Sequence, residues 1–130
     1  MFETAMFLEL IEKAVRKCHK CSVEHGFWDN KDWNFGEKIA LIHSELSEAL
    51  EAHRKGNPLS DHDVCVIDPR HRTVEDPIGT RRLTGVEEEL ADAMIRIFDL
   101  CGKLEIDVGR AILAKMMFNE GREKLHGCAY

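Results

Sequence analysis

Two pairs of carboxylates carry the most specific chemical signal in this sequence. Glu45 and Glu48 lie three residues apart, and the pair of Glu89 and Asp92 repeats that spacing further along. At about 100° per residue, each pair forms a stripe beside the apolar face of a helix. Carboxylates gathered between two packed helices repel one another unless cations neutralise them, and oxygen ligands suit Mg²⁺ or Mn²⁺. We therefore expect these four residues to form a metal site that serves a phosphate substrate.

A solvated helix face is the competing interpretation of each acid pair. Acidic residues at i and i+3 are common on exposed helices, and either pair taken alone is typical of solvent-exposed residues without a specific function. The two pairs, however, occupy the same phase relative to the apolar residues of their own segments. This matched phase favours the metal site.

A polar stripe near the C-terminal end supplies candidates for phosphate binding. Lys115, Asn119 and Arg122 follow at i, i+4 and i+7, which places them on one side of a helix. Arg offers a planar fork to phosphate oxygens, and Lys offers a point charge. The same spacing also fits a solvated face.

The elements that must position these residues are helices. Apolar residues recur at helical spacing in four segments, and Thr84 and Asp107 are plausible N-caps for the last two. All three prolines fall in an irregular insert between the second and third segments, in which residues 64–67 could form a short strand. We expect one all-α domain, a four-helix bundle over residues 1–130, with helices at about 3–24, 35–55, 86–104 and 107–125 and an insert at 57–84.

The amino-acid composition argues against some classes of protein. The chain has 130 residues, of which 44% are hydrophobic and 32% charged, and its formal net charge is −6. An acidic balance argues against a nucleic-acid-binding protein, and the short apolar runs argue against a transmembrane helix. The five cysteines and the absence of an export signal lead us to expect a cytoplasmic protein with reduced thiols. Cys18 and Cys21 have zinc-ligand spacing, but no second such pair exists.

The ordered set of motifs resembles a known family. ELSE at 45–48 followed by ELAD at 89–92 is similar to the E-x-x-E and E-x-x-D motifs of the MazG-like, all-α nucleoside triphosphate pyrophosphohydrolases. The segment from Lys115 to Arg122 resembles the K-x-x-x-N-x-x-R tail of that family. The resemblance covers most of the chain outside the insert.

The resemblance implies a function and a set of roles. It implies a homodimer or a homotetramer that hydrolyses nucleoside triphosphates between the α and β phosphates in a Mg²⁺-dependent reaction, giving the monophosphate and pyrophosphate. The four carboxylates would be metal ligands, and one of them or a neighbouring acid would activate water. Lys115, Asn119 and Arg122 would contact phosphates. Cleansing of the nucleotide pool is one role that such an activity serves.

Aromatic and histidine side chains near the end of the first helix are candidates for a base pocket. Relatives often place a His on the first helix and an aromatic residue just after it near the base, and His19 and Trp28 occupy comparable places. Trp33 or Phe35 could also stack on a base. The aromatic residues fit equally well as a plug for the end of the bundle.

Two other functions remain open at the level of sequence. The chain could bind nucleotide or a partner without turnover, or it could be a helical oligomerisation module with solvated acidic stripes. The presence of all four carboxylates favours the enzyme, because a degenerate relative would be expected to have lost at least one. Dependence of pyrophosphate release on a divalent metal separates the three cases.

Overall fold

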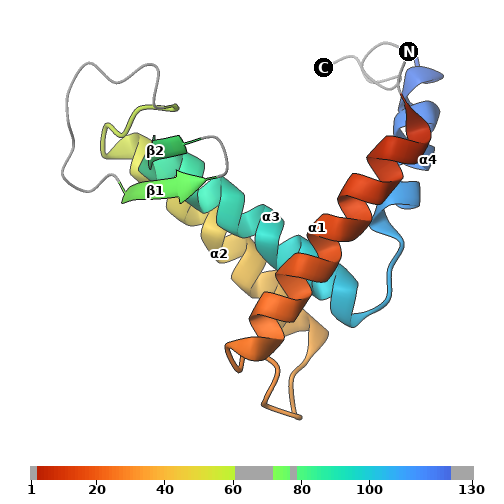
Figure 1. The fold of residues 1–130 in the computed structure, drawn as a ribbon. Helices are drawn as coiled ribbons and strands as arrows, with labels where there is room; N and C mark the ends of the chain where they lie inside the picture. Colours follow the sequence, from red (N-terminus) through yellow and green to blue (C-terminus); the bar gives the residue numbers. More distant parts are fainter. Residues whose placement is uncertain (1–2, 61–71, 77–78, 124–130) are drawn as a thin grey trace. The chain divides into compact units, whose positions relative to one another are not determined.

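The computed structural model describes residues 3–60, 72–76 and 79–123, and this part of the chain is mainly helical (Figure 1). Its helices confirm the expected all-α class. They are α1 (Thr4–Glu24), α2 (Phe35–Arg54), α3 (Gly85–Lys103) and α4 (Val108–Glu120). None of these described helices is long and apolar enough to cross a membrane.

The helix boundaries agree with the sequence prediction except at the end of α4. The helix stops at Glu120 rather than near residue 125, and Gly121 is its C-cap. Glycine has a low helix propensity, which accounts for the earlier stop.

Side-chain caps fix the starts of three helices. Thr84 Oγ1 accepts from the Glu87 N–H at 3.1 Å, and Asp107 Oδ1 accepts from the Arg110 N–H at 3.0 Å, as predicted. Asn34 caps α2 in the same way, with its Oδ1 2.8 Å from the Glu37 nitrogen. Each cap satisfies a backbone donor that has no partner within its own helix.

The insert is more regular than the sequence analysis predicted. It contains an antiparallel hairpin of β1 (Arg72–Asp76) and β2 (Gly79–Leu83), in which Val74 pairs with Arg81. The strand considered at 64–67 lies outside the described residues. The hairpin could not be predicted from the sequence for two reasons. The prolines and glycines of the insert favour an irregular loop, and the pairing of two strands leaves no local periodicity in the sequence.

The two ends of the insert meet at the junction of α2 and α3. Asn57 is buried, and its Nδ2 donates to the Ala52 carbonyl at 2.9 Å. A Cβ atom at position 85 would lie 3.1 Å from Asn57 Oδ1 and 3.2 Å from Ala52 Cβ, so Gly85 permits this close approach. The end of α2 therefore lies beside the start of α3, and the two helices run antiparallel (Figure 1).

The chain divides into two compact units, one formed by residues 26–97 and the other by residues 1–25 with 98–130. We call the first the α2–α3 unit and the second the α1–α4 unit. In the α1–α4 unit, α1 and α4 are neighbours, and Gly109 allows Leu8 to approach the backbone of α4. The buried apolar side chains of the α2–α3 unit are Ile42, Ala49, Val86 and Ala93.

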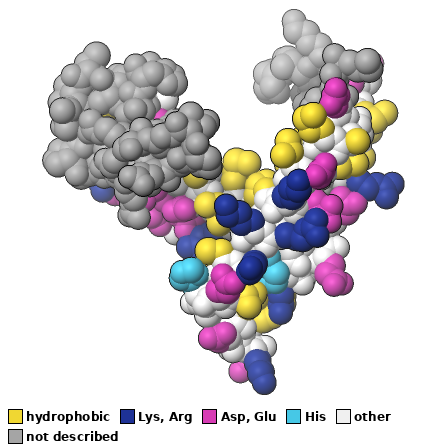
Figure 2. Space-filling model, in the orientation of Figure 1, with side chains coloured by type: hydrophobic (Ala, Val, Ile, Leu, Met, Phe, Trp, Pro, Cys, Tyr) yellow, Lys and Arg dark blue, Asp and Glu magenta, His cyan; other side chains and the backbone are white. Residues whose placement is uncertain are grey.

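The predicted apolar stripes are only partly covered in the single chain. Val86, Ala93 and Leu100 of α3 are buried, whereas other members of the same stripes are exposed by 39% to 56%. Figure 2 shows hydrophobic side chains at the surface of the molecule. The exposed members are Leu46 and Leu50 on α2 and Leu90, Met94 and Ile97 on α3.

The cap at Thr84 gives a test of how α3 is anchored. Thr84 is fully buried, so replacing it with Ala removes the cap and leaves the Glu87 N–H without its side-chain partner. We expect Thr84→Ala to lower the free energy of unfolding by about 1 kcal/mol, measured by urea denaturation. Thr84→Ser keeps the oxygen and is the matched control. Equal losses in the two variants would contradict a capping role.

Candidate metal site

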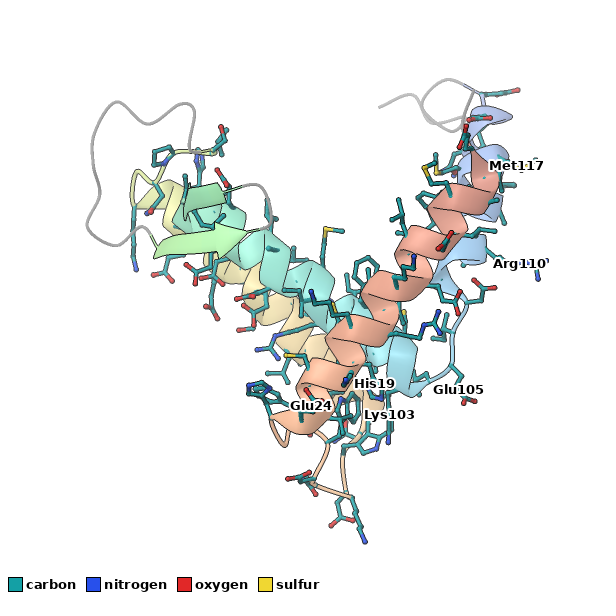
Figure 3. All side chains as sticks on the ribbon, viewed as in Figure 1. His19, Glu24, Lys103, Glu105, Arg110 and Met117 are labelled. Carbon is teal, nitrogen blue, oxygen red and sulfur yellow. The ribbon has the colours of Figure 1, made fainter. Side chains whose placement is uncertain are left out.

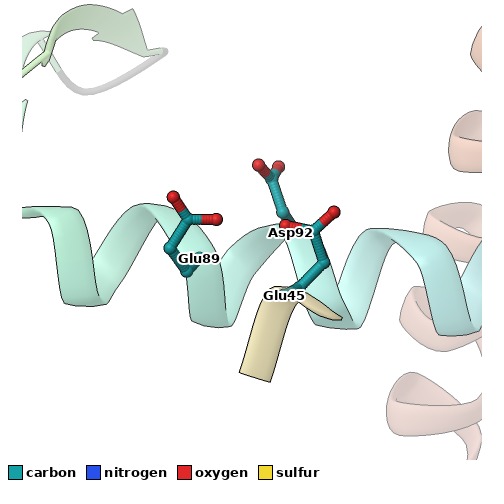
Figure 4. A group of neighbouring side chains, drawn as sticks. All are labelled: Glu45, Glu89 and Asp92. Carbon is teal, nitrogen blue, oxygen red and sulfur yellow. The ribbon is translucent and has the colours of Figure 1, made fainter. Parts of the chain in front are cut away.

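Three carboxylates converge from two helices of the α2–α3 unit. Glu45 comes from α2, and Glu89 and Asp92 come from α3 (Figure 4). One oxygen from each residue lies within 4.8 Å of the others. Ligands on opposite sides of a single divalent cation are about 4–5 Å apart, so a small adjustment of the side chains fits them around one ion.

The antiparallel contact of α2 and α3 brings the acids together. Glu89 and Asp92 are one turn apart on α3 and therefore point to the same side of that helix (Figure 4). Glu45 faces them from the buried side of α2, between Ile42 and Ala49, and it is only 7% exposed. A buried carboxylate is unfavourable unless hydrogen bonds or counter-charges compensate for the lost water.

Arg96 supplies that compensation for Glu45. Its Nε donates to Glu45 Oε1 at 2.5 Å, a short charge-assisted hydrogen bond. Arg96 was not among the residues expected from the sequence to form the site. Its position four residues after Asp92 and seven after Glu89 puts it on the same side of α3, and this spacing could have identified it.

Glu48, the fourth predicted ligand, lies outside the group of three. Its Oε1 accepts a hydrogen bond from Ser44 Oγ at 3.0 Å, and the residue is exposed. It is nevertheless close enough for its negative charge to raise the pKa of Glu89. The structure thus brings three of the four predicted carboxylates together and leaves the fourth beside them.

The environment of Glu89 favours its protonated form. Burial is the largest cause, followed by a hydrogen bond with Glu45 and by the negative charges of Glu48, Glu45 and Asp92, and together they raise the pKa of Glu89 to about 7. A divalent cation would relieve this repulsion and would favour the ionised carboxylate. The three carboxylates are therefore a suitable ligand set for a hard cation such as Mg²⁺ or Mn²⁺.

The predicted phosphate contacts belong to the α1–α4 unit. Lys115 and Asn119 are exposed on the C-terminal half of α4, whereas Arg122 is exposed just beyond the end of the helix, so the expected helical stripe does not extend to Arg122. Lys115 Nζ lies 4.5 Å from the centre of the Phe118 ring, and the Arg122 guanidinium carbon lies 5.6 Å from it. Both cations thus flank one exposed aromatic ring. Figure 3 shows Met117 and Arg110 projecting from the same helix.

His19 takes part in a polar network within the α1–α4 unit. Asp99 accepts hydrogen bonds from His19 Nδ1 at 2.8 Å and from Ser22 Oγ at 2.7 Å. Gly102 makes this contact possible, because a Cβ atom there would lie 2.6 Å from His19 Cβ. Asp99 and Ser22 are partners that the sequence analysis did not identify, since they lie far apart along the chain.

The two predicted aromatic residues contact each other. The rings of Trp28 and Trp33 meet edge to face, with centroids 5.1 Å apart and an interplanar angle of 86°. Lys38 Nζ lies over the Trp28 ring, 4.2 Å from its centroid. An ammonium group on this face leaves less of the ring for stacking on a base. Phe35 is exposed at the start of α2.

The cysteine pair of α1 does not form a metal site in the described part of the chain. Burial raises the pKa of the Cys18 thiol, and the negative charge of Asp99 adds to that effect. The metal-binding thiolate is thereby disfavoured. Among the described residues, the carboxylates are the group of His, Cys, Asp and Glu with the spacing of metal ligands.

Comparison of the chain with protein-family models, with curated proteins and with solved structures found no match. The functional interpretation therefore depends on the sequence motifs and on the geometry of the carboxylates.

Protonation of Glu89 predicts a pH dependence of stability. A carboxyl group whose pKa is higher in the folded state binds more protons there, so the free energy of unfolding falls as the pH rises from about 4.5 through about 7. We expect Glu89→Gln to remove this component. The melting temperature in EDTA, measured from about pH 5 to about pH 8, should fall less steeply in the variant than in the wild type.

Glu51→Gln is the matched control, because Glu51 is exposed on α2 and pairs with Lys55 outside the acidic group. Its pKa is lowered rather than raised, chiefly by the hydrogen bond from Lys55. Parallel pH profiles for wild type and Glu89→Gln would contradict the assignment of the titration to Glu89.

Proposed function

We propose that this protein is a Mg²⁺-dependent nucleoside triphosphate pyrophosphohydrolase of the MazG-like type. It hydrolyses standard or aberrant nucleoside triphosphates between the α and β phosphates, giving the monophosphate and pyrophosphate. The observation that carries this proposal is the convergence of Glu45, Glu89 and Asp92 from the two acidic motifs. Mg²⁺ is the proposed cofactor, and Mn²⁺ is an alternative with similar ligand preferences.

The roles of the carboxylates follow from their surroundings. Glu45, Glu89 and Asp92 would hold the metal, which when bound polarises a phosphoryl oxygen. Glu48 stays outside that group, is exposed and is oriented by Ser44. It is therefore suited to position the attacking water and to accept its proton while the bond between the α and β phosphates breaks and pyrophosphate leaves. Hydrolysis of a phosphoanhydride needs this positioning and charge stabilisation more than a covalent nucleophile.

The substrate contacts remain predictions from the sequence motifs. Lys115, Asn119 and Arg122 are proposed to bind phosphate oxygens, and their exposure leaves them accessible to a ligand. His19 is proposed to lie near the base. Its Nδ1 is fixed by Asp99, so the orientation of the ring is defined.

Assembly into a homodimer or a homotetramer is also part of the proposal. The supporting observation is the set of exposed apolar side chains on α2 and α3, which follow the helical repeat rather than being scattered. The same observation is the specific support for a second candidate function, a helical oligomerisation module without turnover.

Pyrophosphate release tests the proposed function directly. We expect the purified protein to release pyrophosphate and a nucleoside monophosphate from at least one member of a panel of standard and modified nucleoside triphosphates with Mg²⁺, and not with EDTA. Release of single phosphate would indicate a different phosphohydrolase. No release with any substrate would favour the non-catalytic alternatives.

Two substitutions test the carboxylate roles. Asp92→Asn removes a metal ligand and Glu48→Gln removes the proposed proton acceptor, so each should reduce pyrophosphate release by at least about 100-fold. Helix content by circular dichroism should be unchanged. Glu51→Gln makes the same chemical change on α2 outside the site and should retain activity. Wild-type activity in both site variants would exclude this metal-site assignment.

The exposed stripe predicts a measurable change in assembly. Leu90→Lys places a charge within the stripe and should shift the protein toward the monomer in sedimentation-velocity experiments, because burying an unpaired ammonium group in an interface is unfavourable. Leu59→Lys is the control, since Leu59 is exposed outside α2 and α3. If the wild type is itself a monomer at micromolar concentration, the oligomer proposal is wrong.

A further inference from the structure

Arg96 is the cation that contacts the acidic group of the α2–α3 unit. We propose that it binds the phosphate chain of the substrate beside the metal, while Glu45 holds its guanidinium in place. This role is assigned by none of the motifs, which place the phosphate contacts on α4. The inference rests on the proposed function, because it concerns the same site.

The geometry of the ion pair leaves part of Arg96 available to a ligand. The bond to Glu45 uses Nε alone, and within the described residues neither terminal amino group has a hydrogen-bond partner. The side chain of Arg96 is 39% exposed, whereas that of Glu45 is 9% exposed. One edge of the guanidinium is therefore anchored to a buried carboxylate, and the other edge is accessible.

A basic side chain beside the metal offsets negative charge of the site and of its substrate. Glu45, Glu48, Glu89 and Asp92 bring negative charge to the site, and a triphosphate would bring more. Arg96 is a basic side chain that forms an ion pair with one of these acids, Glu45. A guanidinium matches phosphate oxygens with two parallel N–H groups, and its fixed orientation reduces the entropy lost when phosphate binds.

A purely structural ion pair would behave differently from a phosphate-binding arginine. If Arg96 only supported Glu45, its removal would disorder the metal ligand and would weaken metal and nucleotide binding together. If Arg96 binds phosphate, its removal takes away a positive charge that repels the metal and attracts the nucleotide. The two affinities should then change in opposite directions.

The experiment measures both affinities on the full chain by titration calorimetry. The first probe is Mn²⁺ alone, and the second is an α,β-imido nucleoside triphosphate at saturating Mn²⁺, which cannot be hydrolysed at the α–β bridge. The analogue carries the nucleobase of the nucleoside triphosphate from which the wild type releases pyrophosphate fastest. For Arg96→Gln we expect about three- to tenfold tighter Mn²⁺ binding and about ten- to hundredfold weaker analogue binding.

Arg96→Lys is the second variant, and it keeps the positive charge while losing the fork. Its Mn²⁺ affinity should stay at the wild-type value, and its analogue affinity should fall between those of wild type and Arg96→Gln. This variant also tests the proposal if Arg96→Gln does not fold. If Arg96→Gln is unfolded and Arg96→Lys binds the analogue as tightly as the wild type does, the proposal is overturned.

Arg54→Gln is the matched control. It removes the same charge from the same unit, but Arg54 lies nine residues beyond Glu45 on α2, roughly 13 Å along the helix axis. This exceeds the distance over which exposed charges interact at physiological salt. Both affinities should remain at the wild-type values, and circular dichroism should show that every variant is folded.

The outcomes separate the two proposals. Opposite shifts in Arg96→Gln support phosphate binding by Arg96. Parallel weakening of Mn²⁺ and of the analogue would overturn the role of Arg96 and leave the proposed function intact. Failure of the wild type to bind either probe would overturn the proposed function and the role of Arg96 with it.

Discussion

The antiparallel contact between α2 and α3 is the constraint on which the candidate site depends. Gly85 and Asn57 let the end of one helix lie against the start of the other. From that junction the helical repeat determines which residues face each other, and it places Glu45 opposite Glu89 and Asp92. A side chain at position 85 would crowd Asn57 and Ala52, so these neighbours would have to shift by a few tenths of an ångström at this junction.

The contact between α2 and α3 determines the chemical environment of Glu45. The residue lies on the buried side of α2, where an isolated carboxylate would be unfavourable. Arg96 compensates for its charge on one side, and Glu89, whose pKa is raised by burial and by the neighbouring negative charges, lies on another. The site is therefore electrostatically strained in the absence of a cation. This strain makes the same residues suitable for binding one, since a metal replaces the proton and offsets the repulsion.

The α1–α4 unit has a polar network of its own, built by the same kind of close approach. Within this unit, Gly102 lets His19 approach the last turns of α3, and Asp99 then joins His19 and Ser22. Like the acidic group, this network combines residues that are distant in the sequence. In both units a glycine permits a close approach of side chains, at Gly85 to Asn57 and at Gly102 to His19.

The sequence by itself determined the four helices, the caps at Thr84 and Asp107, and the two acidic pairs, because periodicity, capping and i, i+3 spacing are local properties. It did not reveal the β hairpin, the early end of α4 or the exposure of Leu90 and its neighbours. Only the tertiary structure decided that Glu45, rather than Glu48, joins the acids of α3, and that Arg96 pairs with it. The physical reason is that a helical stripe fixes the direction of a side chain, whereas its partners depend on which helix packs against that stripe.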